Sequence, residues 1–107
     1  MKPQPLYQEL KDLAERLEIT VREQNLRQPG IKVRSGLCRV KGQWVFIMDK
    51  HKNIHQKCRL LGICLGSIPM ETVYVVPAVR EFIDRHRNPD VVDLRLVIDQ
   101  SESAKPV

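Results

Sequence analysis

Long hydrophobic runs are missing from this chain of 107 residues, and no apolar stretch approaches the roughly 18 residues of a membrane-spanning helix. The N-terminal residues also lack the apolar segment of a signal peptide. We therefore expect a cytoplasmic protein that does not act at a membrane. The compact size favours a bacterial source.

Cysteine is scarce and odd in number, with Cys38, Cys58 and Cys64 each inside an apolar pattern. An odd count without a signal peptide argues against a disulfide framework. We interpret the three cysteines as buried free thiols that act as small hydrophobic side chains.

Catalytic motifs are absent as well. No C-x2-C, H-E-x-x-H, G-x-S-x-G or phosphate-binding glycine motif occurs in the sequence. His55 and Cys58 stand three residues apart and are weak candidates for a metal site, but no carboxylate supplements them. We therefore predict no catalytic residue, no cofactor and no metal, which makes a metal-dependent hydrolase the least favoured function.

Positive charge is present but unevenly spread. Residues 31–60 carry eight basic side chains and one acidic one, whereas residues 1–30 are balanced and residues 61–107 carry a charge of −2. A basic cluster of this kind can hold backbone phosphates, although aromatic residues for base stacking make up only 5% of the chain. The alternative is a solvated basic face. The candidate anion or nucleic-acid contacts are Arg34, Arg39, Lys41, Lys50, Lys52, Lys57 and Arg59.

The stretch from Ser35 to Lys50 organises the predicted fold. It reads as two strands joined by a two-residue turn at Lys41-Gly42, where glycine tolerates a positive φ. This register places Arg39 opposite Trp44, a cation–π contact worth about 0.5–1 kcal/mol at an exposed site. The second strand is apolar on both faces and therefore belongs inside a sheet.

Helical and strand patterns flank this hairpin. The sequence predicts a helix with a leucine stripe from Leu6 to Leu17, then a short strand over Ile19–Glu23. A second helix follows an N-cap at Asn53 and ends at Gly66, and Pro77 opens a third. These patterns predict one α+β domain over residues 1–88, with a three- or four-stranded, mostly antiparallel sheet and about three helices.

Residues 89–107 form a predicted C-terminal extension. Apolar and polar residues alternate from Val92 to Ile98, which is typical of a half-buried strand over about 91–98. Such a strand can add an edge to the sheet or pair with a second copy of the chain to form a homo-oligomer. The remaining residues are polar and are expected to be loose.

The element order, with the residues GLCRVKG and WVFIMD of the hairpin, resembles the minimal zinc peptidase domain of the ImmA/IrrE type over roughly residues 6 to 68. The resemblance implies a zinc-binding helix after the hairpin. At the corresponding position stand Gly62-Ile63-Cys64-Leu65-Gly66, so no catalytic residue carries over. The hairpin and the segment Val76–Phe82 are also similar to those of small uncharacterised bacterial proteins.

Together these observations favour a non-catalytic module that binds a partner protein in a regulatory role. Binding of nucleic acid or another acidic ligand by residues 31–60 is the alternative. A fold hosts many functions, so neither resemblance selects between them.

Overall fold

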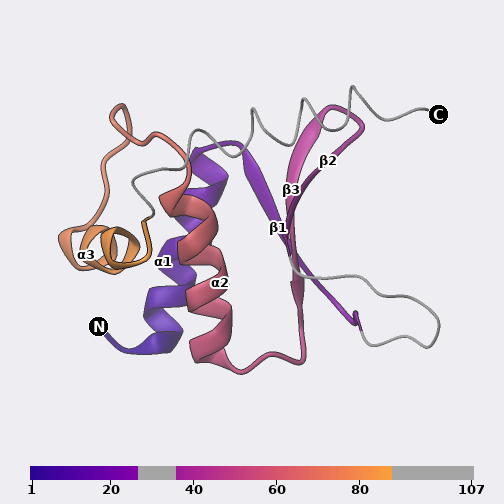
Figure 1. Cartoon of the computed structure of the whole chain (residues 1–107), viewed down its shortest axis with the longest axis horizontal. Coiled ribbons are helices and arrows are strands. Elements are labelled where there is room, and N and C mark those ends of the chain that lie inside the picture. The colour runs from indigo at the N-terminus through magenta and orange to yellow at the C-terminus, as the bar shows by residue number, and fades with distance from the viewer. Residues whose placement is uncertain (27–35, 88–107) are drawn as a thin grey trace.

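The computed structural model describes residues 1–26 and 36–87, and these contain three helices and one three-stranded sheet (Figure 1). None of the helices in these two ranges is long and apolar enough to cross a membrane. The predicted α+β class is confirmed. The elements in chain order are α1 (Pro3–Arg16), β1 (Ile19–Gln24), β2 (Gly36–Val40), β3 (Gln43–Asp49), α2 (Ile54–Gly66) and α3 (Pro77–Arg85).

The β2–β3 hairpin has the predicted register, with Arg39 opposite Trp44 and Val40 opposite Gln43. Lys41 and Gly42 both have positive φ, at 51° and 80°, which is the backbone of a type I′ turn. Such a turn matches the right-handed twist of the two strands, so this local sequence fixes the hairpin.

The predicted "mostly antiparallel" sheet is corrected to a mixed one. The strand order is β1-β3-β2, with β2 antiparallel to β3 and β1 parallel to β3, so that Val21 lies beside Phe46. Alternation of apolar and polar residues specifies a face for each strand but not its direction. The alternation pattern therefore could not predict whether β1 runs parallel or antiparallel to β3.

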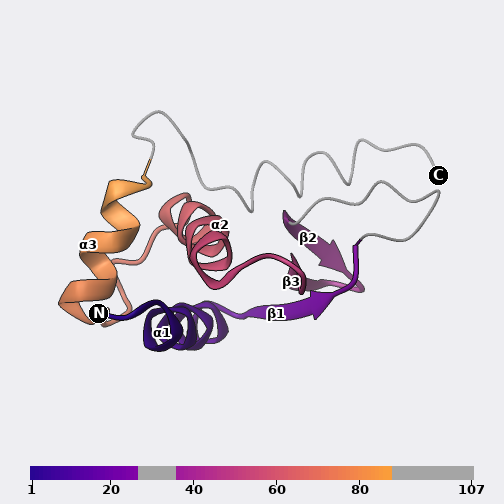
Figure 2. The same ribbon diagram turned by 90° about the horizontal axis from the view of Figure 1, so that it is seen from below.

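The fold has three layers, which Figures 1 and 2 show from two sides. The sheet forms one layer, α1 and α2 pack side by side on one of its faces, and α3 lies on the outer side of these two helices. The core between sheet and helices includes Phe46 and Met48 of β3, while Val45 on the opposite face of β3 is also buried, at 1% exposed.

Helix α1 begins at Pro3, before the first residue of the predicted leucine stripe, and this proline occupies its first turn. Its predicted leucine stripe is buried, and Tyr7, which the pattern did not assign to the core, is only 4% exposed. Tyr7 lies one position after Leu6 and widens the buried face of the helix.

Helix α2 begins as predicted at the Asn53 N-cap. The Asn53 side chain accepts a hydrogen bond from the Gln56 backbone N–H at 2.9 Å, and the Gln56 side chain accepts one from the Asn53 N–H at 3.3 Å. This reciprocal capping box satisfies two backbone donors that the helix itself leaves open.

The contact between α2 and α3 requires a glycine. A Cβ atom at Gly62 would lie 2.6 Å from Cε2 of Phe82 on α3, whereas one at Gly66 would approach its neighbours no closer than 3.4 Å. Gly62 therefore lets the two helices approach more closely than any other residue would allow.

The predicted extension over 89–107, its edge strand at 91–98 and the homo-oligomer through Val92–Ile98 lie outside the described residues. Ser35 and Arg34 also lie outside them.

We predict unequal effects for two alanine substitutions in α2. Gly62→Ala lowers the free energy of unfolding by about 1 kcal/mol, because displacing the Phe82 ring outweighs the gain in helix propensity. Gly66→Ala changes it by less than about 0.5 kcal/mol, because its Cβ makes ordinary contacts. Urea denaturation of both variants measures the difference, and an equal effect of the two would contradict the role of Gly62.

Candidate functional site

A shallow groove runs along the outward face of α2. It has a volume of about 270 Å³, and we call it the α2 groove. Ile63 is 41% exposed in it, one of the few large apolar side chains on the surface of the described residues. Leu60 beside it is half-buried. The residues that line the groove are Lys52, Gln56, Arg59, Leu60 and Ile63.

The groove has a positive electrostatic character. From Lys50 to Gly66 the sequence contains no acidic residue, and Lys52 and Arg59 flank the apolar floor. The N-terminus of α2 adds the positive end of the helix dipole next to Lys52. An apolar strip with cations at its border and no carboxylate on the same helix favours an acidic occupant.

The structure separates the predicted anion contacts into two groups. Arg39 and Lys41 lie at the β2–β3 turn, while Lys50 and Lys52 follow the other end of β3. Seven residues of β3 place the two ends roughly 20 Å apart. Arg34 lies outside the described residues. The predicted set is therefore not one continuous patch within the described part of the chain.

Arg39 has the structural role that the register predicted. Its guanidinium carbon lies 5.3 Å from the centre of the Trp44 ring. This is within the range of a cation–π contact, so Arg39 covers one part of the indole.

Lys57 belongs to a cluster that joins α1, β1 and α2. Its Nζ lies 2.6 Å from Oε1 of Glu23, and the Tyr7 hydroxyl donates to Oε2 of the same carboxylate at 2.9 Å. The side chains of Lys57 and Glu23 are only 14% and 32% exposed. Lys11 and Lys57 also lie over the Tyr7 ring, at 4.7 and 5.8 Å from its centre. Lys57 is thus neutralised and is not available to an anionic ligand.

This cluster perturbs two pKa values. Burial, together with the hydrogen bond to Glu23, raises the pKa of Tyr7 above its usual value of 10.0. Burial alone would raise the pKa of Glu23, but the hydrogen bonds from Lys57 and Tyr7 outweigh it, and the pKa is lowered. The alternation along β1 could have predicted that the Glu23 side chain faces the helices, because Glu23 lies on the same face of the strand as Ile19 and Val21.

The weak metal candidates do not come together. His55 is exposed, whereas Cys58 is buried. The Cys58 thiol donates a hydrogen bond to the Pro3 carbonyl oxygen at 3.3 Å, and burial raises the pKa of this thiol. Residues 1–26 and 36–87 contain no group of three or more His, Cys, Asp or Glu side chains that could hold a metal ion. Cys58 and Cys64 are buried, as predicted, whereas Cys38 is half-buried, and none of the three forms a disulfide.

The segment that corresponds to a zinc motif in the peptidase resemblance is occupied by helix packing. Phe82 lies against Gly62, and the backbone of Ile83 and Arg87 lies against Gly66. A histidine side chain at Gly62 would overlap the Phe82 ring. These positions serve the contact between α2 and α3.

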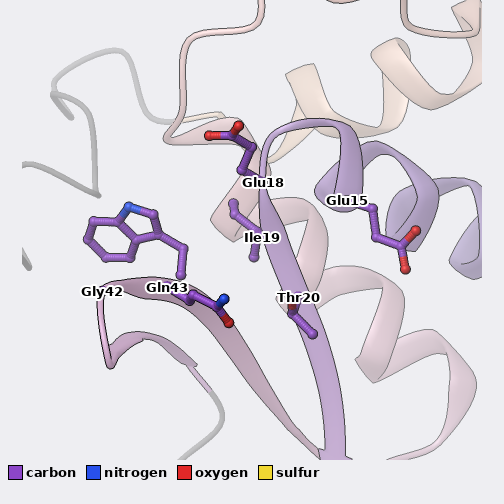
Figure 3. A pocket seen from close by; sticks show the side chains of 7 residues that line it. Glu15, Glu18, Ile19, Thr20, Gly42 and Gln43 are labelled. Carbon is purple, nitrogen blue, oxygen red and sulfur yellow. The ribbon is translucent and has the colours of Figure 1, made fainter.

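A second hollow lies at the opposite end of the sheet, between the α1–β1 turn and the β2–β3 turn (Figure 3). It has a volume of about 420 Å³, and we call it the hairpin-end pocket. Sequence patterns gave no sign of it, because its walls come from separate parts of the chain. Its lining consists of Glu15, Glu18, Ile19, Thr20, Gly42, Gln43 and Trp44.

Comparison with known proteins gives no match among family models, curated proteins or solved structures. The function must therefore be inferred from the surfaces of the molecule itself.

We predict that Tyr7 makes the fold less stable at high pH. A folded-state pKa above the unfolded value of 10.0 means that stability is fully present below pH 10 and is lost as the pH rises beyond it. Tyr7→Phe should lower stability at pH 8 by about 1 kcal/mol and reduce the loss between pH 9 and 11. Urea denaturation across this range tests both.

Tyr74→Phe is the matched control, because Tyr74 is 73% exposed. It should keep the wild-type profile. A Tyr7→Phe profile parallel to the wild type would show that Tyr7 does not carry this pH dependence.

Proposed function

We propose that this protein is a non-catalytic binding module that holds an acidic segment of a partner protein in the α2 groove. The observation that carries the proposal is the exposed Ile63 in an apolar strip bordered by Lys52 and Arg59. Exposed apolar side chains within a charged border are typical of protein interaction sites.

The size of the groove favours a protein segment over a cofactor. Its volume of about 270 Å³ falls below the roughly 300–1,000 Å³ of small-molecule sites. A single large apolar side chain of a partner can cover Leu60 and Ile63, while carboxylates beside it pair with Lys52 and Arg59. The apolar contact supplies affinity, and the charges select an acidic partner and speed its association.

A nucleic-acid ligand fits the same surface less well. Tight binding to duplex DNA commonly uses 6–10 phosphate contacts, roughly. Of the predicted contacts that the structure describes, Lys50, Lys52 and Arg59 provide three cations at this end, since Lys57 is paired with Glu23. The exposed Ile63 has no role in phosphate binding.

A cytoplasmic location is part of the same proposal. None of the three cysteines forms a disulfide, which suits a reducing compartment where disulfides are rare.

Selection from a displayed library of random dodecapeptides tests the proposal. We expect the enriched peptides to carry several Asp or Glu residues around one large apolar residue. Their affinity should fall about fivefold in Ile63→Ser and about tenfold in the double variant Lys52→Glu/Arg59→Glu, and it should fall further with added salt.

Arg80→Glu on α3 is the matched control, because Arg80 is exposed and lies on another helix. It should bind the selected peptides as the wild type does. Peptides without acidic bias, or binding that all these variants retain, would overturn the proposal. Salt-sensitive binding to a 20-base-pair DNA duplex without peptide enrichment would replace it with the nucleic-acid function.

A further inference from the structure

The hairpin-end pocket collects negative charge from two sources. Glu15 and Glu18 both line it; Figure 3 shows Glu18 extending from the α1–β1 turn on the side of the hairpin, whereas Glu15 extends on the other side of β1. The C-terminus of α1 ends at the same place and contributes the negative end of its helix dipole. Arg16, the basic residue of that last turn, donates from Nη1 to the Tyr74 carbonyl at 2.8 Å and is thereby directed to another segment.

The pocket also contains an aromatic wall. Trp44 is half-buried and lines it, whereas Arg39, which lies 5.3 Å from the same ring, is not part of the lining. The indole therefore offers the pocket a surface that Arg39 does not cover. The Arg39 contact shows within this protein that the ring accepts a guanidinium group.

Glu18 occupies its place at a conformational cost. Its φ is 64°, in the left-handed region, and its N–H donates to the Glu15 carbonyl at 2.9 Å after the end of α1. Glycine is the residue usually found at this position of a helix C-terminus, because a Cβ atom there costs roughly 1–2 kcal/mol. A change to glycine thus removes the carboxylate without harming the fold.

We propose that the hairpin-end pocket binds an organic cation with a guanidinium group. The Glu18 carboxylate, the C-terminus of α1 and the indole all attract such a group, and its planar face stacks on the aromatic ring. The volume of about 420 Å³ is that of a small-ligand site. This site is separate from the α2 groove and does not depend on the function proposed for that groove.

A bare metal ion does not fit the same pocket. Glu15 and Glu18 are its two carboxylates, and no described group of three ligating side chains includes them. Calcium requires six to eight oxygen ligands, roughly, so two carboxylates leave most of its shell to water. The indole wall favours the organic cation further.

Trp44 makes the test direct, because it is the single tryptophan of the chain. Titration with N-acetyl-arginine amide at low salt should change its fluorescence with a half-saturation of about 1 mM. N-acetyl-citrulline amide has nearly the same shape without the charge and should give no saturable change. An equal response to both compounds would overturn the proposal.

Variants of Glu18 separate binding from folding. Glu18→Gln should weaken binding about fivefold. Glu18→Gly should abolish the saturable response and raise the melting temperature. Glu81→Gln on α3 should bind like the wild type, since α3 lies on the other side of the helical layer from the sheet (Figure 1). Unchanged binding in both Glu18 variants would also overturn the proposal.

The guanidinium group can belong to a free small molecule or to an arginine side chain of a protein. Agmatine represents the first source, and an arginine-containing tripeptide blocked at both ends represents the second. Tighter binding of agmatine indicates a free small molecule. Tighter binding of the tripeptide indicates the arginine side chain of a protein. Saturation by either supports the site, and saturation by neither contradicts it.

Discussion

Strand β3 carries apolar side chains on both of its faces, and the need to bury them constrains every other element. Val45 on one face and Phe46 and Met48 on the other are each at most 3% exposed. This burial requires a neighbouring strand at each edge, which β1 and β2 supply. It also requires a cover, which α1 and α2 form on the face that carries Phe46.

The helical layer depends on a second constraint, the close contact between α2 and α3. Gly62 permits it, because any Cβ there would meet the Phe82 ring. In this chain these turns of α2 are used for packing against α3.

The two ends of the sheet carry different surface features. At the end where β3 leads into α2, cations border the apolar strip of the α2 groove. At the other end, Glu18 and Trp44 line the hairpin-end pocket. The Tyr7–Glu23–Lys57 cluster joins α1, β1 and α2, and it neutralises Lys57. Formal charge counted along the sequence did not show that Lys57 is paired or that Glu18 lines a pocket with Trp44.

The sequence by itself determined the hairpin register, the Asn53 cap and the α+β class, because each depends on neighbouring residues or on a short repeat. Tertiary structure alone decided the parallel direction of β1, the pairing of Lys57 with Glu23 and the place of Glu18 beside Trp44. Each of these joins residues at least 25 positions apart, and periodicity within one segment says nothing about which other segment it meets.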